Sequence, residues 1–297
     1  MVTTERRIGF MGLGIMGRAM AVNVAKAGYP LIVYNRTSRD IGDLKKSGIE
    51  SAPSPRVLAE KSDIIITMVT GPEAIDNLLW SEDGAARAFT PEKTFINMST
   101  VSPMFTKALH QKLVPTGVTF IDAPVSGSKK PAEDATLLIL AGGPKEKIEA
   151  LTPLFKTMGK GVVFCGEAGQ GSMMKMANNL LLGLMIEGLA ETMLFGEKAG
   201  LSQEALIEVI TNGPLNSPIF QMKIPTLKAR RYDPNFPLKH ATKDLKFLID
   251  TASEMGVMLP AGQTMLSLFS IGVAKQWGDL DIGAILNVLE SINKTGD

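Results

Sequence analysis

The sequence predicts an α/β fold in which a doubly wound, mostly parallel sheet is followed by an all-α C-terminal domain. Over the first 165 residues, short β-branched runs alternate with helical patterns, which is the order of βαβ units. After Gly171 only helical periods remain. A long apolar helix is predicted at this change and joins the two parts.

The predicted strands are short runs bounded by Gly, Pro, Asn or Asp. They are Arg7–Met11, Leu31–Tyr34, Asp63–Val69, Thr94–Asn97, Val118–Asp122, Thr136–Leu140 and Val162–Cys165. Ile64–Ile66 and Leu137–Leu140 are apolar without alternation, as is typical of strands covered on both faces.

The second half is predicted to be helical. Breaks are expected at Gly200–Ser202, Gly213–Pro218, Asp233–Pro237, Met255–Pro260 and Trp277–Ile282. The stretch Ser172–Lys198 would form one helix about 40 Å long at ~1.5 Å per residue. We therefore divide the chain into domains 1–167 and 168–297, with the linking interdomain helix at about 172–198.

The composition excludes several classes of protein. The 297 residues carry 31 Lys and Arg against 30 Asp and Glu, and a net charge of +1 gives no electrostatic footprint for nucleic acid or an anionic membrane. With 45% hydrophobic and 21% charged residues, the chain can fill a sizeable core and is not expected to be disordered.

Membrane, metal and disulfide roles are not expected. The apolar stretch Met173–Gly200 includes two asparagines and three glutamates, which a lipid-spanning helix would hardly tolerate. Cys165 is the single cysteine, and the histidines are His110 and His240, so neither a disulfide nor a structural zinc site is predicted. A cytoplasmic location follows as the default, and Cys165 and His110 are interpreted as packing residues.

A glycine-rich turn follows the first predicted strand. It consists of Gly12, Leu13, Gly14, Ile15, Met16 and Gly17, and a helical pattern comes next. In a dinucleotide-binding fingerprint, one glycine makes the tight turn, one lets the backbone approach the pyrophosphate and one allows close helix–strand packing. The alternative is an ordinary glycine-rich turn, but the strand–turn–helix order favours a Rossmann-type cofactor domain.

The end of the second strand indicates which dinucleotide is bound. Tyr34 is followed by Asn35, Arg36, Thr37 and Ser38, without the acidic residue that binds the ribose 2′-hydroxyl in NAD-specific sites. Arg36 can stack on adenine or hold a 2′-phosphate, and the others are neutral donors. NADPH is favoured over NADH; a solvated arginine in a turn is the alternative.

A Ser-Gly-Ser turn follows a later strand end, where ligands bind in open α/β sheets. A hydroxyl from Ser126 and successive backbone N–H groups can form a concave anion site suited to a carboxylate. A simple polar loop is the alternative. Lys129 and Lys130 are expected to be solvated charges.

At the head of the long helix, Lys175 and Asn179 are four residues apart and share a face. The surrounding positions are apolar, so the helix is expected to be buried. A buried lysine must be paired or face a cleft; a lysine that snorkels to the surface is the alternative. On spacing alone, Lys243 and Asp244 are interpreted as charges of a surface helix.

The sequence resembles the β-hydroxyacid dehydrogenase family, which includes 3-hydroxyisobutyrate dehydrogenase, tartronate semialdehyde reductase and, more distantly, 6-phosphogluconate dehydrogenase. The resemblance runs from about Ile8 to Leu289 and rests on four motifs in order: GFMGLGIMG (9–17), DAPVSGS (122–128), GxxxKxxxN (171–179) and KDL (243–245). SGSKKPAED (126–134), LLILAGG (137–143) and FPLKHATKDL (236–245) look most like the NADPH-dependent glyoxylate/succinic semialdehyde reductases. Other members usually have SGG where this chain has SGS.

The resemblance implies an NADP(H)-dependent reductase of small carboxylate-bearing aldehydes, forming glycolate from glyoxylate or 4-hydroxybutyrate from succinic semialdehyde. It also implies a homo-oligomer, dimer or tetramer. The catalytic residue would be Lys175, with Asn179 as its helper, and the substrate contacts would be Ser126, Gly127, Phe236 and Asp244. Cofactor contacts would come from the Gly12–Gly17 turn and from Asn35, Arg36, Thr37, Met68, Val69, Thr100 and Lys243.

Elementary chemistry agrees with this role for Lys175. During reduction, charge grows on the carbonyl oxygen, and an ammonium within hydrogen-bond reach can stabilise it and donate the proton. A lysine with an ordinary pKa of ~10.4 is charged at pH 7. The alternatives are an NAD-dependent 3-hydroxyisobutyrate or tartronate semialdehyde dehydrogenase and a non-catalytic dehydrogenase-like binding module. Because Lys175 and Asn179 are present, the binding module and imine reduction are disfavoured.

Overall fold

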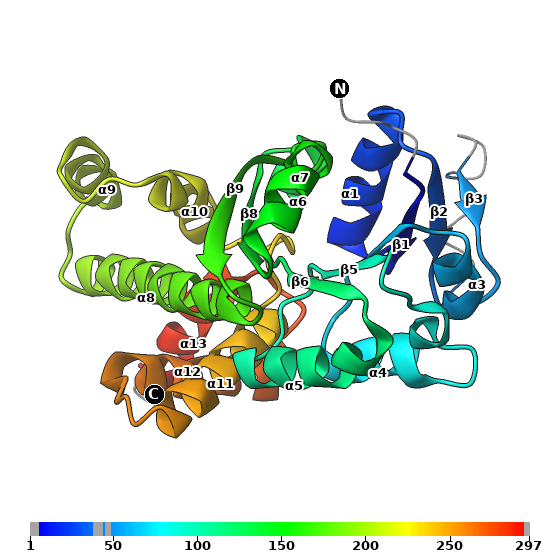
Figure 1. Ribbon diagram of the computed structural model, residues 1–297. Coiled ribbons are helices and arrows are strands. Elements are labelled where there is room, and N and C mark those ends of the chain that lie inside the picture. Colours follow the sequence, from blue (N-terminus) through cyan, green and yellow to red (C-terminus); the bar gives the residue numbers. More distant parts are fainter. Residues whose placement is uncertain (1–5, 38–43, 45–48, 294–297) are drawn as a thin grey trace. The chain divides into compact units, whose positions relative to one another are not determined.

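The computed structural model describes residues 6–37, 44 and 49–293 (Figure 1). Ser38, one of the neutral donors expected near the cofactor, lies outside the described residues. The chain divides into two compact units, Met1–Lys175 and Met176–Asp297.

A nine-stranded sheet forms the centre of the described part of the first unit. Its strands are β1 (Ile8–Met11), β2 (Leu31–Tyr34), β3 (Glu50–Ser51), β4 (Ile64–Thr67), β5 (Thr94–Asn97), β6 (Thr119–Asp122), β7 (Val125–Ser126), β8 (Leu137–Gly142) and β9 (Gly159–Gly166). The order is β3-β2-β1-β4-β5-β6-β8-β7, with β9 paired to β8. The pairs from β3 through β6 are parallel, as is β8 with β9, while β8 runs antiparallel to β6 and β7. The mostly parallel sheet predicted from the sequence is confirmed.

Some strands differ from the prediction. The two-residue strands β3 and β7 were not predicted, because two residues carry no periodic signal. Strand β9 begins at Gly159 rather than Val162, because the predicted strand was bounded by the glycine before Val162. A Cβ at Gly159 would lie 2.3 Å from the carbonyl oxygen of Leu137, so this glycine permits close strand pairing.

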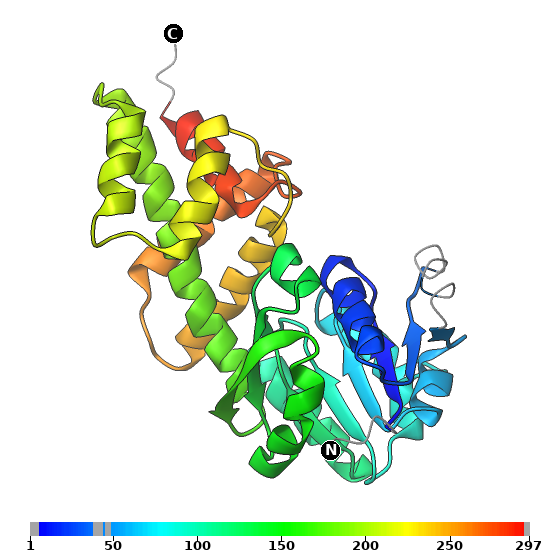
Figure 2. The same cartoon turned by 90° about the horizontal axis from the view of Figure 1, so that it is seen from above.

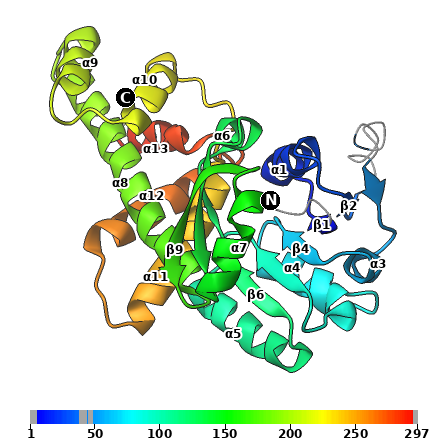
Figure 3. The same ribbon diagram turned by 45° about the horizontal axis from the view of Figure 1, so that its top comes forward.

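Helices cover both faces of the sheet. On one face, α1 (Ile15–Lys26), α6 (Lys129–Glu133) and α7 (Lys145–Phe155) supply Met20, Ala132 and Leu151 to a core that includes Phe10. The other face is covered by α3 (Pro55–Glu60), α4 (Pro72–Trp80) and α5 (Pro103–Leu113), together with the short turn η2 (Ala85–Ala88). The short turn η3 (Val114–Thr116) follows α5 and has no buried residue. Figure 3 shows α7 beside β9. This is the doubly wound arrangement of a Rossmann-type fold.

The second unit is helical in its described part (Figure 2). Its helices are α8 (Gln170–Lys198), which begins in the first unit, α9 (Gln203–Asn212), α10 (Pro218–Ala229), α11 (Leu238–Glu254), α12 (Pro260–Ala274), η4 (Ile282–Ala284) and α13 (Ile285–Ile292). Leu189, Leu227, Phe269 and Leu286 belong to its buried core. The predicted helix breaks and the long joining helix are confirmed, although α8 starts two residues before Ser172.

By length and composition alone, α8 could also cross a membrane. However, 44% of its most apolar window is buried inside the protein. Within the second unit, the buried Asn179 of this helix is hydrogen-bonded to α11. Core helices of folded domains give the same apolar signal.

Candidate active site

In the glycine turn after β1, two of the three glycines are required by close contacts and the third faces open space. Gly12 has φ +98°, and a Cβ there would lie 2.4 Å from the carbonyl oxygen of Met68. A Cβ at Gly17 would lie 2.0 Å from the carbonyl oxygen of Gly12, so only glycine lets α1 pack this closely on the turn. Gly14 faces open space at the start of α1. The turn therefore leaves room for a ligand beside Gly14.

The N-terminus of α1 is suited to a phosphate. No side chain caps the helix at Gly14, and its first turn contains no acidic residue. The first N–H groups of a helix carry a partial positive charge and bind anions when no side chain occupies them. The glycine turn and this helix end together fit the pyrophosphate of a dinucleotide.

A cavity of about 570 Å³ adjoins the turn within the first unit. The predicted cofactor residues that line it are Gly12, Gly14, Asn35, Arg36, Thr37 and Val69. It lies where the strand order reverses between β1 and β4, which is where open α/β sheets bind ligands. The prediction did not include the other lining residues, Tyr34, Pro53, Ser54, Pro55, Thr70, Ala74, Asn77, Leu78, Ser81 and Asp83. Apart from Tyr34, the last residue of β2, they come from loops and helices without a sequence motif.

The remaining predicted cofactor residues lie close to the turn or at strand ends. Leu13 is buried, and its N–H donates to Oδ1 of Asn35 at 3.0 Å. Ile15 is exposed in the first turn of α1, and Met16 packs partly against the core. After β4, the N–H of Val69 donates to Oγ of Ser99 at 2.9 Å.

The end of β5 contributes further residues to this edge of the sheet. Asn97 accepts hydrogen bonds from Oγ1 of Thr67, at 3.0 Å, and from the N–H of Ser99, at 3.1 Å. Both bonds fix the backbone that leads into the half-buried Thr100. Met68, which follows β4, is also half-buried. Asn97 and Ser99 shape this edge of the sheet and were not singled out from the sequence.

The Ser126–Gly127 turn closes strand β7. Ser126 is half-buried, and Gly127 has φ +130°, a conformation that favours glycine. A Cβ at Gly127 would lie 2.7 Å from a methyl carbon of Leu137. Lys129 and Lys130 are exposed, and Lys130 forms an ion pair with Asp134 at 2.7 Å. The turn thus presents a hydroxyl and backbone groups, with the lysines in solvent.

Asp122, at the end of β6, holds the start of α8. Its two carboxylate oxygens accept hydrogen bonds from the N–H groups of Gly169 and Ser172, each at 2.7 Å. Burial raises the pKa of the Asp122 carboxyl to about 6, although the hydrogen bonds from Gly169 and Ser172 oppose this rise. Asp122 is the first residue of the DAPVSGS motif (122–128), but no feature of the sequence indicated this contact.

Lys175 lies in the second turn of α8 and is 8% exposed. This burial excludes the alternative of a lysine that snorkels to the surface. Asn179, one turn farther along the same helix, is 6% exposed. The two side chains thus occupy the buried face that the four-residue spacing predicts.

Within the second unit, Asn179 is paired with α11. Its Nδ2 donates to Oδ2 of Asp244 at 2.9 Å, and Oδ1 of Asp244 lies 3.1 Å from Nζ of Lys243. Asp244 is 4% exposed, so the interpretation of this carboxylate as a surface charge is wrong. The interpretation from residue spacing was wrong because spacing does not show which face of α11 packs on α8.

Phe236 is held by a buried ion pair that the sequence did not indicate. Nζ of Lys223 donates to Oδ1 of Asp281 at 2.5 Å, and the N–H of Phe236 donates to Oδ2 of the same carboxylate at 3.0 Å. Asp281 also accepts a hydrogen bond from the N–H of Gly283 at 3.0 Å. These contacts fix the loop that leads into α11, which carries Lys243 and Asp244.

Two family models match consecutive parts of the chain. One describes the NAD binding domain of 6-phosphogluconate dehydrogenase and matches residues 7–166. The other describes the NAD-binding domain of NADP-dependent 3-hydroxyisobutyrate dehydrogenase and matches residues 169–289. The chain belongs to the β-hydroxyacid dehydrogenase family. Members of this family are NAD(P)-dependent oxidoreductases that act on hydroxy acids.

Individual relatives span nearly the whole chain. Glyoxylate/succinic semialdehyde reductase 1 of Arabidopsis thaliana is 33% identical over 283 residues, covering 95% of this chain and 98% of the relative. The 2-hydroxy-3-oxopropionate reductase of Escherichia coli is 34% identical over 285 residues, covering 96% and 97%. The structure of 3-hydroxyisobutyrate dehydrogenase from Mycobacterium tuberculosis, determined with L-serine, has a TM-score of 0.87 at 28% identity and covers 96% and 99%.

Proposed function

We propose that this β-hydroxyacid dehydrogenase is an NADPH-dependent reductase of small aldehydes that carry a carboxylate, with glyoxylate and succinic semialdehyde as candidate substrates. The observation that carries the proposal is the buried Lys175 on α8, one turn before an asparagine that is itself fixed by Asp244. The Arabidopsis relative bears the name of this activity.

The proposed preference for NADPH rests on the end of β2. Arg36 is exposed at the cavity, and Tyr34, Asn35 and Thr37 beside it include no carboxylate. A guanidinium can form a bidentate hydrogen-bonded pair with a 2′-phosphate, whereas a carboxylate at this place would repel it. When bound, the reduced nicotinamide supplies the hydride.

The chain's own residues supply the rest of the chemistry. In the proposed mechanism, the ammonium of Lys175 donates a hydrogen bond and then a proton to the carbonyl oxygen of the substrate. Asn179 is held by its hydrogen bond to Asp244, so its amide group has a fixed orientation one helical turn from Lys175. The Ser126 hydroxyl and the backbone N–H groups at Gly127 would bind the substrate carboxylate.

Initial rates of NADPH oxidation test the proposal. Glyoxylate, succinic semialdehyde and the neutral aldehyde butanal are offered in parallel to the purified protein. We expect rapid turnover of the two acids and little turnover of butanal, because only the acids can use the Ser126–Gly127 turn. Equal turnover of all three would contradict the carboxylate anchor, and no turnover of either acid would contradict the substrate class.

A second candidate is the reduction of 2-hydroxy-3-oxopropionate, supported by the 34% identical relative from Escherichia coli. This compound, tartronate semialdehyde, is also a small aldehyde with a carboxylate, so the same residues could serve. The two candidates are separated by comparing kcat/KM for 2-hydroxy-3-oxopropionate, glyoxylate and succinic semialdehyde with the same cofactor. A further alternative is the oxidation of 3-hydroxyisobutyrate with NAD, so NADH and NADPH are also compared with the preferred substrate.

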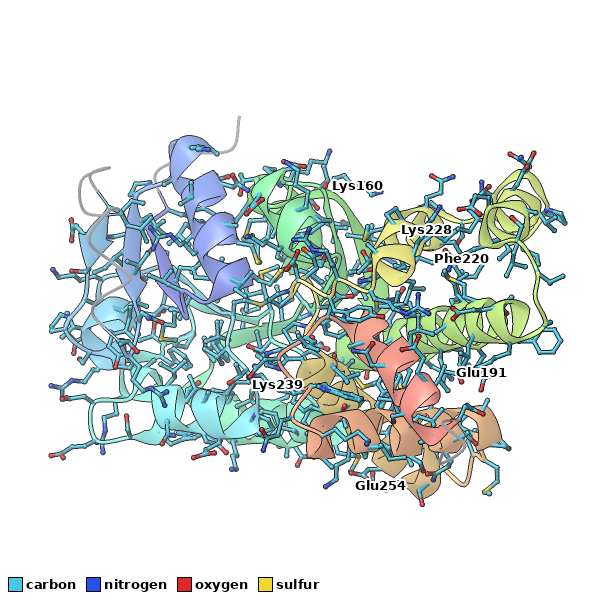
Figure 4. All side chains as sticks on the ribbon, turned by 180° about the vertical axis from the view of Figure 1, so that it is seen from behind. Lys160, Glu191, Phe220, Lys228, Lys239 and Glu254 are labelled. Carbon is cyan, nitrogen blue, oxygen red and sulfur yellow. The ribbon has the colours of Figure 1, made fainter. Side chains whose placement is uncertain are left out.

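We also propose that the protein is a homo-oligomer and lies in the cytoplasm. Leu181 and Phe195 on α8 are 62% and 72% exposed, and exposed apolar side chains on this helix support a surface that a second copy covers. A groove of about 290 Å³ between α8, α9 and α10 is lined by apolar side chains that include Phe220 (Figure 4). A monomer by light scattering would contradict the oligomer.

The cytoplasmic location is supported by the single cysteine of the chain, Cys165, which is a free thiol.

A further inference from the structure

The carboxylate of Asp122 occupies the N-terminal end of α8. It is fully buried, and its two oxygens accept one backbone N–H each, from Gly169 and from Ser172, at 2.7 Å. Gly169 immediately precedes α8, and Ser172 lies in its first turn. One side chain at the end of β6 therefore fixes both the position and the rotation of the start of the helix.

Close packing around Asp122 shows that this arrangement is built into the fold. A Cβ at Gly171 would lie 2.4 Å from the carbonyl oxygen of Leu140 and 2.6 Å from that of Asp122. At Gly142, a Cβ would lie 2.5 Å from Oδ1 of Asp122. Both glycines let the helix start approach the sheet to hydrogen-bond distance of the carboxylate.

A second contact holds the same turn. Oγ of Ser172 lies 2.9 Å from Oγ1 of Thr106 on α5, and both residues are buried. Ser172 is three residues before Lys175, so the two side chains lie on the same side of α8. A shift or rotation at Ser172 is therefore transmitted to Lys175 within one helical turn.

We propose that Asp122 is a positioning residue, whose paired hydrogen bonds to Gly169 and Ser172 set the location of Lys175 relative to the carboxyl edge of the sheet. This inference rests on the proposed role of Lys175 as the proton donor. It assigns to Asp122 no contact with substrate or cofactor. Both acceptor oxygens are needed, because an amide in the same place would direct an N–H₂ group at one of the two backbone N–H donors.

Burying the Asp122 carboxylate costs free energy, and this cost supports a specific role for the group. A carboxylic acid that loses its hydration disfavours ionisation, and burial raises the pKa of Asp122 to about 6. The carboxylate form still dominates at pH 7, where the partial positive charge of the helix end stabilises it. A neutral cap would avoid this cost but would offer one acceptor oxygen instead of two.

Asp122→Asn tests the proposal, with Asp63→Asn as the matched control. Asp63 is an exposed carboxylate that also accepts a backbone N–H, from Arg7 at 2.8 Å, but it precedes β4 at the opposite end of the strands. For Asp122→Asn we expect kcat to fall on the order of 10²-fold, as small misplacements of a catalytic group can cause. The Kd for NADPH should stay unchanged, because the glycine turn and the cavity are not touched. Asp63→Asn should keep both values.

Two further readouts separate positioning from general damage. In hydrogen–deuterium exchange, amide protection in Asp122→Asn should fall in residues 167–176 and remain unchanged in β1, β4 and α1. With 4-deuterated NADPH, the primary isotope effect on kcat should rise, because the chemical step becomes slower while binding does not. Thr106→Val, which removes the hydroxyl contact but keeps Asp122, serves if Asp122→Asn fails to fold and should show the same changes to a smaller degree.

The outcomes distinguish this inference from the proposed function. If Lys175→Ala lacks activity while Asp122→Asn keeps wild-type kcat and wild-type protection of residues 167–176, Asp122 is not a positioning residue. If Lys175→Ala remains active, the proposed function itself fails. A fall in kcat for Asp122→Asn with uniformly increased exchange in the first unit would also contradict positioning, since it would show general destabilisation.

Discussion

Asn179 on α8 donates a 2.9 Å hydrogen bond to Asp244 on α11, and both side chains are at least nine-tenths buried. The two residues are 65 positions apart in the sequence. This bond fixes the orientation of the Asn179 amide one helical turn from Lys175. It also gives the KDL motif a physical role within the helical unit.

Removing the Asp244 carboxylate, which accepts this hydrogen bond, should therefore lower both the stability of the protein and its kcat. Asp244→Ala leaves Nδ2 of Asn179 buried without its partner, which costs about 1–3 kcal/mol of unfolding free energy. We expect a lower Tm and a reduced kcat, measured by thermal unfolding and initial rates. Asp250→Ala is the control, because Asp250 is an exposed carboxylate on the same helix. Equal behaviour of the two variants would show that the pair with Asn179 has no special role.

Arg36→Ala should change the choice of cofactor. Loss of a charge-assisted contact to the 2′-phosphate is expected to raise KM for NADPH about ten- to a hundredfold, with little change for NADH. The measurement is the ratio of kcat/KM for the two cofactors. Arg87→Ala, at an exposed arginine of η2, should leave the ratio unchanged. Parallel losses with both cofactors would remove Arg36 from phosphate recognition.

Two lysines of α10 show how burial changes the contribution of an ion pair to stability, because one ion pair is buried and the other is exposed. Lys223 and Asp281 form an ion pair whose side chains are 6% and 1% exposed. Lys223→Met would leave the carboxylate buried without its cation, which costs about 3–5 kcal/mol. Lys228, labelled in Figure 4, pairs with Glu204 at 2.7 Å in solvent. Lys228→Met should barely change the unfolding midpoint in urea. If the midpoints of the two variants coincide, Asp281 does not depend on Lys223.

Glu187 on α8 should make stability depend on pH. Burial, and then the charge of Glu191, raise its pKa to about 7. A folded-state pKa above the unfolded value means that the folded protein binds the proton more tightly, so this contribution stabilises at low pH and is lost as pH rises through 7. Glu187→Gln should raise Tm at pH 8 and leave it nearly unchanged at pH 5. Glu254→Gln, at an exposed position of α11, is the control (Figure 4). A gain in Tm that is the same at both pH values would contradict the raised pKa.

The features that could be predicted from the sequence are those that depend on residues close together in the chain. Gly12 and Gly17 have separate steric reasons to be glycine, and each reason acts within a few residues of the turn or on the adjacent strand. The helix breaks were equally local, because Ser202 and Ser217 cap α9 and α10 by accepting hydrogen bonds from the backbone N–H groups of Ala205 and Phe220. Such signals can be read without knowing the tertiary structure.

Contacts between distant segments could not be predicted. Asp122 meets Gly169 and Ser172 across 47 and 50 residues, and Lys223 meets Asp281 across 58. Nothing in a single sequence states which acid approaches which helix start. The burial of Asp244 was missed for the same reason, since a charged residue early in an amphipathic helix is usually in solvent.

The central claim is that Lys175 donates the proton in an NADPH-dependent reduction. The most direct test is the rate of NADPH oxidation by wild-type protein and Lys175→Ala with saturating succinic semialdehyde, alongside the Kd for NADPH. We predict that kcat falls by about 10²–10⁴-fold, the usual contribution of a general acid, while the Kd stays the same. A variant that turns over at nearly the wild-type rate would contradict the account.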